Sequence, residues 1–278
     1  MVNREKRNEL LKEMNKRTLV MGIINATPDS FSDGGKYNDC EAAVQRARQL
    51  VADGADIIDI GGESTRPNAV PVGLEEELKR VIPVVRAVAR AVDVPISIDT
   101  YKAEVAKQAL EAGASIINDV WGAKKDACMA EVARDYDVPI ILMHNRETAE
   151  YKHLISDMIA DLKESISICL NAGVKEENII LDPGIGIGFA KTYEQNLEVM
   201  RHLDAFVALG YPVLIGTSRK SMIGQALNLP VDERMEGTGA TVCYGMMKGC
   251  NIVRVHDVKE IKRMVQMMDV LIRGSHDG

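Results

Sequence analysis

A chain of 278 residues, 46% of them hydrophobic, is long enough for one large α/β domain and too apolar to be disordered. Its formal net charge of −7 argues against general nucleic-acid binding through a basic surface, so an anionic ligand would need a local cationic pocket. No apolar run approaches the length of a membrane span, and five cysteines without a C-x-x-C pair indicate reduced thiols in a cytoplasmic protein. We therefore expect neither nucleic acid nor a membrane as a partner.

The first segment of the chain, "MVNREKRNELLKEMNKR", is strongly polar. It contains no apolar stretch of the kind found in a secretory signal, and Glu5, Glu9 and Glu13 argue against a transit peptide. We expect residues 1–17 to form a polar N-terminal extension, either a short helix or a frayed end outside the core. Residues 18–278 are then the folded domain.

Short runs rich in Val, Ile and Leu follow one another along the rest of the chain. Runs that are apolar at nearly every position are typical of parallel strands buried on both faces. The segments between them have helical periodicity; in 41–52, apolar residues recur every three or four positions. Eight strand–helix units predict an α/β protein with a single-domain TIM (β/α)8 barrel, and a doubly wound sheet is the alternative. The eight runs are 18–27, 55–65, 94–100, 115–122, 138–145, 178–184, 211–221 and 251–257.

Each apolar run ends in polar or charged residues. In a TIM barrel the active site lies at the carboxyl ends of the strands, and polar side chains buried there without partners would be costly. The sequence therefore predicts a site for a polar ligand at that rim. The residues are Asn25, Asp59, Asp99, Asn118, His144, Asn145, Asp182, Lys220, Arg254 and His256.

Three of these side chains suit a nitrogen-rich ring. Asp99, Asn118 and Asp182 could bind the edge of a cyclic guanidine, because a carboxylate accepts two parallel hydrogen bonds well. The alternative for Asp99 is a helix N-cap. Asp182 is a weaker candidate for a cap, because Pro183 follows it and disfavours helical geometry.

Two segments near the last strands suit an anion. "TSRKS" at 217–221 offers hydroxyls, backbone N–H groups and two cations, and Arg254 and His256 point the same way from one strand. Phosphate sites of such barrels often follow strands seven and eight. We expect a local anion site there, with a solvated turn as the alternative for "TSRKS".

The loops have their own signals. The glycine-rich "DPGIGIGF" at 182–189 matches neither the dinucleotide fingerprint nor the P-loop. Segments 25–39 and 61–73 are typical of lids or binding loops, and Arg66 in the second could meet an anion. Asn25 would offer a metal only a neutral carbonyl oxygen, which suits Mg²⁺ held mainly by substrate phosphates. No zinc-type cluster and no activated nucleophile stand out.

Seven motifs together carry a resemblance. "NATPDSFSDGG", "DIGGESTRP", "SIDTYKAEVA", "IINDVWG", "LDPGIG", "GTSRKS" and "RVHDV" resemble, in this order, the motifs of the dihydropteroate synthase family. The resemblance implies a TIM barrel, usually homodimeric, that joins 6-hydroxymethyl-7,8-dihydropterin diphosphate to 4-aminobenzoate, giving 7,8-dihydropteroate and pyrophosphate. The C–O bond would break before the amine attacks. The resemblance also implies inhibition by sulfonamides, which mimic the aminobenzoate.

The resemblance further implies roles for particular residues. Asp99, Asn118, Asp182 and Lys220 would hold the pterin, with Met143 against its ring. Asn25 (through Mg²⁺), Arg66, Arg254 and His256 would face the diphosphate, and Thr65, Pro67, Phe189 and Ser221 would shape the aminobenzoate site. Lys220, Arg254, His256 and Asp99 would take part in catalysis.

The chain departs from the family pattern at Ala26, where the family usually has Val, and in "DPGIGIGF", where the family has D-P-G-I-G-F. The loop is therefore two residues longer beside the aminobenzoate site. We hypothesise that the lengthened stretch Ile185–Phe189 favours the small substrate over bulkier sulfonamides, with neutral drift of loop length as the alternative.

Two other functions compete with the synthase, a pterin-dependent methyltransferase and a non-catalytic pterin-binding barrel. The "TSRKS" and "RVHD" segments with both long loops favour a diphosphate substrate. The expected ligands of that substrate are all present, which argues against a binding module.

Overall fold

The strands of the protein close into a barrel in the computed structural model, which describes residues 4–26, 35–63, 72–186 and 190–274. All strand pairs are parallel, in the order β6-β5-β4-β3-β2-β1-β8-β7. A parallel bridge between Leu181 and Val213 joins the two ends of this order. The prediction of a TIM barrel is confirmed, and the doubly wound alternative is wrong.

All eight predicted strands are present, and each is shorter than its apolar run. The shortest, β7, covers only Leu214–Ile215; Pro212 just before it cannot donate a backbone hydrogen bond. The strands are β1 Leu19–Asn25, β2 Ile57–Gly61, β3 Ile96–Asp99, β4 Ile116–Asp119, β5 Ile140–Met143, β6 Ile179–Asp182, β7 Leu214–Ile215 and β8 Ile252–Val255.

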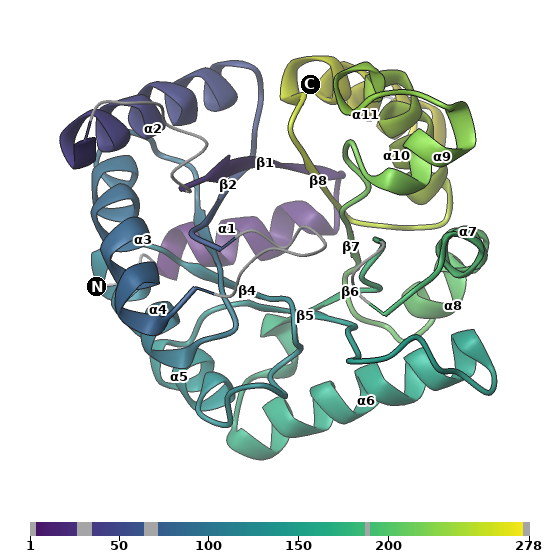
Figure 1. Cartoon of the computed structure of the whole chain (residues 1–278), viewed down its shortest axis with the longest axis horizontal. Helices are drawn as coiled ribbons and strands as arrows, with labels where there is room; N and C mark the ends of the chain where they lie inside the picture. Colours follow the sequence, from purple (N-terminus) through teal and green to yellow (C-terminus); the bar gives the residue numbers. More distant parts are fainter. Residues whose placement is uncertain (1–3, 27–34, 64–71, 187–189, 275–278) are drawn as a thin grey trace.

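Helices surround the strands (Figure 1). The predicted helical pattern at 41–52 lies within α2, and apolar residues spaced for one helix face, such as Val81, Val85 and Val88, are buried against the sheet. The helices are α1 Arg4–Met14, α2 Gly35–Ala52, α3 Leu74–Ala89, α4 Ala103–Ala112, α5 Met129–Tyr136, α6 Leu154–Ala172, α7 Tyr193–Arg201, α8 Leu203–Val207, α9 Ser221–Leu227, α10 Met235–Met247 and α11 Val258–Arg273. Two 3₁₀ turns cover Glu176–Asn178 and Val231–Glu233.

Alternation along each strand separates two environments. In β2, Ile58 and Ile60 belong to the cluster beneath the helices, whereas Ile57 belongs to a separate cluster with residues near the starts of the other strands. Asp59, next after Ile57 on that inner face, is fully buried. The interior of the barrel is therefore apolar at the amino ends of the strands and polar toward their carboxyl ends.

The amino end of the barrel is covered by α1, which lies behind the strands in Figure 1. Leu10 and Met14, one helical turn apart, are buried in the inner cluster with Leu19 and Met21. The segment is a helix, as one alternative expected, but the expectation that it lies outside the core is wrong for these two side chains. Without them, the apolar inner cluster would face water.

No helix among the described residues is long and apolar enough to cross a membrane.

Candidate active site

A guanidinium lies between two carboxylates inside the barrel. Arg254 Nε donates to Asp59 Oδ2 at 2.6 Å, and Arg254 Nη2 donates to Asp99 Oδ2 at 2.7 Å. Asn118 Nδ2 donates to the same Asp59 oxygen at 3.3 Å. Burial opposes the charge on Arg254, but Asp59 and Asp99 outweigh it and raise the pKa of the guanidinium. Four of the predicted rim residues thus meet, because Arg254 bonds to Asp59 and Asp99, and Asn118 bonds to Asp59.

Asp59 was predicted to lie at the rim, but no role of its own was assigned to it. It is fully buried, and its Oδ1 has no hydrogen-bond partner among the described residues. Its signal in the sequence is a charged residue within an apolar strand, two positions before the strand ends. Such a residue must face a buried partner, because an unpaired internal charge is costly.

Asp99 does not cap a helix. The N-cap position of the following α4 is Lys102, which makes no side-chain cap hydrogen bond, so the alternative considered for Asp99 is wrong. Burial raises the pKa of Asp99 to about 7; Arg254 opposes this increase, and Asp59 adds to it. A carboxyl group with this pKa can accept a proton at neutral pH as well as hydrogen bonds.

The glycine-rich loop turns back on Asp182. The Gly184 N–H donates to Asp182 Oδ1 at 2.7 Å, and the Gly186 N–H donates to Asn196 Oδ1 at 2.7 Å. Gly184 has a φ of 67°, and a Cβ there would collide with the backbone oxygen of His144. The glycines therefore let the chain turn beside Asp182. Burial raises the pKa of Asp182, and Lys220 opposes the increase.

Lys220 reaches into the same space. Its Nζ donates to the backbone oxygen of Ile185, and a Cβ at Gly216 would stand 3.9 Å from both that Nζ and Arg254 Cβ. Burial lowers the pKa of Lys220 to about 8, against the attraction of Asp182. Lys220 and the stem of Arg254 thus both lie close to the backbone at Gly216.

Three more predicted residues in the described ranges lie at or just after the carboxyl ends of strands. Met143 is buried and packs with Val120, and the partly buried Trp121 belongs to this cluster. Asn25 ends β1 with an exposed side chain, and Ser221 begins α9 half-buried. Met143 thus offers an apolar surface, whereas Asn25 and Ser221 offer polar groups.

His256 and Ser218 are joined twice. The backbone N–H of His256 donates to Ser218 Oγ at 3.1 Å, and the same Oγ lies 2.9 Å from His256 Nδ1. Burial lowers the pKa of His256 to about 4, and the nearby cations Arg254, Arg219 and Arg46 lower it further, while Asp257 opposes them. The imidazole is therefore neutral at pH 7.

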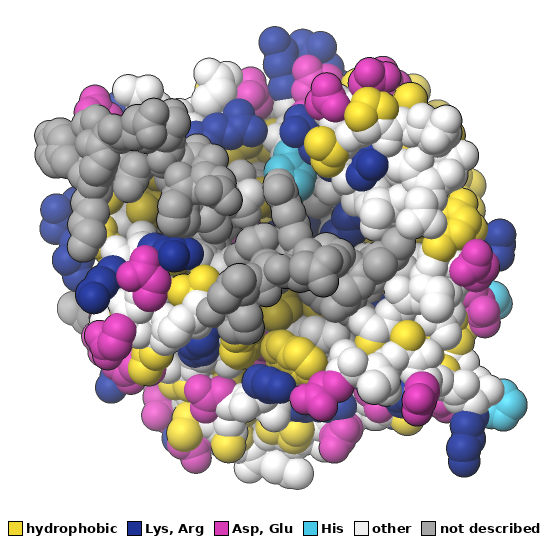
Figure 2. All heavy atoms as spheres, in the orientation of Figure 1, with side chains coloured by type: hydrophobic (Ala, Val, Ile, Leu, Met, Phe, Trp, Pro, Cys, Tyr) yellow, Lys and Arg dark blue, Asp and Glu magenta, His cyan; other side chains and the backbone are white. Residues whose placement is uncertain are grey.

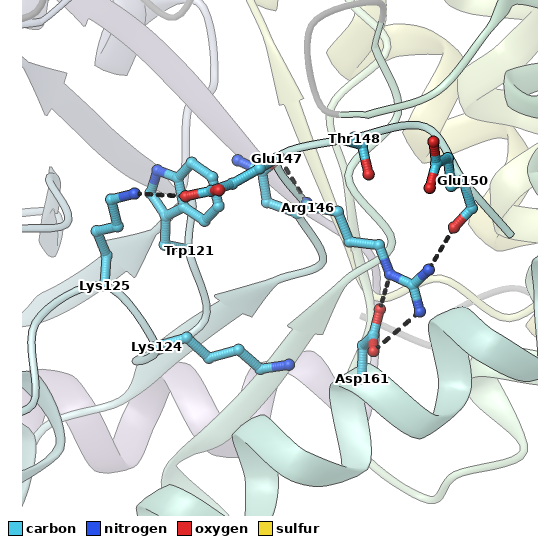
Figure 3. Close-up of a pocket in the computed structure, with 9 residues that line it drawn as sticks. Trp121, Lys124, Lys125, Arg146, Glu147, Thr148, Glu150 and Asp161 are labelled. Atoms are coloured by element: carbon cyan, nitrogen blue, oxygen red, sulfur yellow. Dashed lines mark hydrogen bonds and ion pairs between the residues drawn. The ribbon is translucent and has the colours of Figure 1, made fainter.

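A chain of buried and partly buried polar groups next to the glycine-rich loop was not predicted. Lys191 Nζ lies 3.0 Å from His144 Nδ1, and His144 Nε2 lies 2.9 Å from Asp161 Oδ2. Arg146 Nε donates to the same Asp161 oxygen at 2.6 Å (Figure 3). Burial lowers the pKa of Lys191 to about 7. Lys191 had no signal in the sequence, because lysines in loops are usually solvated.

A surface pocket lies beside this chain, between the segments that follow β4 and β5 (Figure 3). Its cations face carboxylates, with Lys125 Nζ at 3.2 Å from Glu147 and Arg146 paired with Asp161. Figure 2 likewise shows both signs of charge around the face of the barrel toward the viewer. The pocket has no surplus of one charge. It is lined by Trp121, Lys124, Lys125, Asn145, Arg146, Glu147, Thr148, Glu150 and Asp161.

Some predicted residues lie outside the described ranges. They are Thr65, Arg66, Pro67 and Phe189. The described residues bring Asp59, Asp99, Asn118 and Arg254 into one hydrogen-bonded group, with Asp182 and Lys220 coupled electrostatically to Arg254.

A buried, charge-paired group of polar side chains at the carboxyl end of a TIM barrel is typical of an enzyme that binds a polar ligand. Residues 21–256 match the sequence pattern of the pterin binding enzymes, and the chain belongs to that family. It is 60% identical over 265 residues to dihydropteroate synthase from Clostridium beijerinckii, covering 94% of this chain and 98% of the relative. It is also 60% identical to dihydropteroate synthase from Bacillus subtilis, covering 94% of this chain and 92% of the relative.

Solved structures agree. Dihydropteroate synthase from Clostridium difficile, crystallised with pteroic acid, superposes with a TM-score of 0.90 at 50% identity, covering 93% of this chain and 98% of that one. The Xanthomonas albilineans enzyme with 4-aminobenzoic acid superposes with a TM-score of 0.88 at 39% identity, covering 92% of this chain and 94% of that one. The Yersinia pestis enzyme with a sulfonamide drug superposes with a TM-score of 0.85 at 40% identity, covering 92% of this chain and 94% of that one. The resemblance inferred from the motifs is confirmed.

Proposed function

We propose that this chain is an active dihydropteroate synthase, which condenses 6-hydroxymethyl-7,8-dihydropterin diphosphate with 4-aminobenzoate and releases pyrophosphate. The observation that carries the proposal is the buried group of Asp59, Asp99, Asn118 and Arg254, with Asp182 and Lys220 beside it. Relatives at 60% identity bear the name of this synthase, which favours it over a methyltransferase or a binding module.

Pterin recognition follows from the carboxylates. The pterin ring presents N–H groups along one edge, and Asp182 and Asn118 supply acceptors deep in the barrel. Met143 would lie against the ring face. Lys220 keeps a positive charge near Asp182 and therefore favours its ionised, accepting form.

Departure of the diphosphate needs positive charge and donors. Arg254 is fixed by two carboxylates and is charged at any physiological pH, so it can stabilise the growing charge without reorganising. His256 adds a donor on the same strand end. With the leaving group so stabilised, C–O cleavage can precede attack by the amine, and no protein nucleophile is required.

Mg²⁺ fits the site as an ion carried by the substrate. Among the described residues no group of three or more His, Cys, Asp or Glu side chains could hold a metal, and Asn25 offers one exposed amide oxygen at the end of β1. Asn25 would therefore complete the shell of an ion bound mainly by diphosphate oxygens. When bound, the ion would neutralise charge on the leaving group.

One substitution tests the pterin part of the site, and a second serves as its control. Asp182→Asn should weaken binding of pteroate, which has the pterin but no diphosphate, by about tenfold or more, because a carboxylate acceptor is lost. Ser165→Ala, at another buried side chain on α6, is the control. Titration by pterin fluorescence quenching measures the effect. Pteroate affinity unchanged in Asp182→Asn would contradict the assigned pterin site.

We also propose that the lengthened loop reduces sulfonamide inhibition. The loop is anchored on both sides of residues 187–189, by the Gly186–Asn196 hydrogen bond and by Tyr151 Oη, which donates to the Ala190 oxygen at 2.9 Å. Extra residues between two anchors must change the loop path, beside the aminobenzoate site that the family resemblance implies. A clash with the part of a sulfonamide that exceeds the substrate outline then gives selectivity.

Deleting Ile187–Gly188 restores the family spacing. The ratio of the sulfonamide inhibition constant to the KM for 4-aminobenzoate should fall by about tenfold, as expected for removal of a modest steric clash. A deletion that weakened binding of the sulfonamide and of 4-aminobenzoate equally would leave this ratio unchanged. An unchanged ratio would mean that the insertion is neutral.

We further propose a cytoplasmic homodimer. Among the described residues, eight of the ten exposed large hydrophobic side chains lie between 227 and 272, and Met247 is 72% exposed. On α11, Met267, Val270 and Leu271 share one face by their spacing. Such a surface suits burial against a second copy. Cys128, Cys169, Cys243 and Cys250 are free thiols, which suits a reducing compartment.

A further inference from the structure

We infer that Ser218 is a positioning residue that holds His256 in the tautomer with its proton on Nε2, so that His256 presents a neutral donor to the departing diphosphate. The role of His256 at the diphosphate rests on the proposed function. The inferred tautomer itself rests only on the hydrogen bonds around Ser218.

The donors around Ser218 leave one consistent arrangement. The His256 backbone N–H can only donate, so Ser218 Oγ accepts this bond, at 3.1 Å. The hydroxyl has one proton of its own, and His256 Nδ1, at 2.9 Å, is the one acceptor that the described residues offer it. Ser218 is 5% exposed, so a hydroxyl without an acceptor there would be costly. Nδ1 must therefore be an acceptor, which places the ring proton on Nε2.

The charges around His256 keep the ring neutral. Arg254 lies on the same strand, Arg219 follows β7, and Arg46 of α2 donates to the His256 backbone oxygen at 3.0 Å. Asp257 opposes these cations, but it is bound by Arg219 Nε at 2.9 Å. Protonation of the ring is thus disfavoured, and the tautomer decides which nitrogen can donate.

The tautomer matters because the ligand is anionic. Nε2, the nitrogen not held by Ser218, makes no hydrogen bond to a described residue. With a proton it donates to a phosphate oxygen, and without one it turns a lone pair toward that oxygen. Without Ser218, some molecules would have an unprotonated Nε2, whose lone pair repels the phosphate oxygen. Ser218 would act in this way without touching the substrate.

Ser218 is well placed for this role because its neighbours fix the loop. The Arg219 N–H donates to Thr238 Oγ1 at 3.1 Å, and Thr241 Oγ1 donates to Thr217 Oγ1 at 2.8 Å. Both Thr238 and Thr241, which make these hydrogen bonds, belong to α10. The backbone on each side of Ser218 is thus held independently of its own hydroxyl, so that Ser218→Ala should leave the loop in place.

The test reads the tautomer in the resting protein. Protein labelled with ¹⁵N at histidine is measured by long-range proton–nitrogen correlation spectra, with His256 assigned by its loss in His256→Gln. We expect His256 to show a protonated Nε2 and an unprotonated Nδ1, and Ser218→Ala to show a mixture of tautomers. A protonated Nδ1 in the unmodified protein, or an unchanged spectrum in Ser218→Ala, would overturn the inference.

Activity supplies a second arm. Ser218→Ala should lower kcat/KM for the dihydropterin diphosphate by about tenfold or more, with pteroate affinity unchanged, because pteroate has no diphosphate. Ser218→Thr should recover most of the loss, and the buried Ser165→Ala serves as control. Equal activity of Ser218→Ala and the unmodified protein would overturn the catalytic part. An inactive unmodified protein with the expected tautomer would instead contradict the proposed function.

Discussion

Several ionisable side chains at the carboxyl end of the barrel titrate near neutral pH. Burial raises the pKa of Asp99 to about 7 and lowers those of Lys191 and Lys220 to about 7 and about 8. Burial makes the charged form of each group costly, and an opposite charge or a hydrogen bond offsets part of that cost. Such shifted groups are expected in an active site.

Lys191 gives a pH-dependent prediction of stability. Its pKa is lowered from 10.5 to about 7, so between these values the unfolded chain binds one more proton than the folded chain. Folding stability contributed at this residue therefore rises with pH through that window. Relative to Lys191→Met, the unmodified protein should gain about 2 kcal/mol between pH 7 and pH 9.

Urea unfolding of both proteins at the two pH values measures this gain. The other titrating groups are common to both proteins and largely cancel in the difference. Lys152→Met, at an exposed lysine, is the control and should show no pH-dependent difference. Parallel stability curves for Lys191→Met and the unmodified protein would contradict a buried lysine with a lowered pKa.

Among the secondary-structure elements, α1 has the least expected role, since it covers the amino end of the barrel. Its Leu10 and Met14 are 5% and 1% exposed, whereas Lys12 between them is exposed. Met14→Ala should reduce the free energy of unfolding by about 2–4 kcal/mol, because it leaves a cavity in the inner cluster. Lys12→Ala should change it by less than about 0.5 kcal/mol. Equal effects in urea unfolding would show that the helix does not stabilise the barrel.

The strands were predictable because runs such as 138–145 are apolar at nearly every position, the pattern of a doubly covered strand. The contribution of α1 was not, because Leu10 and Met14 are two apolar residues in a charged segment, and only the open end of the barrel makes their burial favourable. Asp99 and Arg254 could be assigned to the rim, but not to each other. Their pairing depends on strands β3 and β8, which are far apart in sequence.

At the scale of the whole molecule, exposed apolar side chains are concentrated on α10 and α11. Sedimentation velocity should show a dimer, and Leu271→Glu combined with Met247→Glu should shift it toward a monomer, because buried charges oppose association. Glu substitutions at Leu170 and Leu74, which are exposed elsewhere, are the matched control. A monomer before substitution would contradict the proposed dimer.

The central claim, that the barrel is a synthase, is tested most directly by pyrophosphate release from the purified protein with the dihydropterin diphosphate and Mg²⁺, with and without 4-aminobenzoate. The account predicts release that depends strongly on 4-aminobenzoate, accompanied by dihydropteroate. No release from either mixture by folded protein would contradict the claim and would leave a methyl-transfer or pterin-binding role.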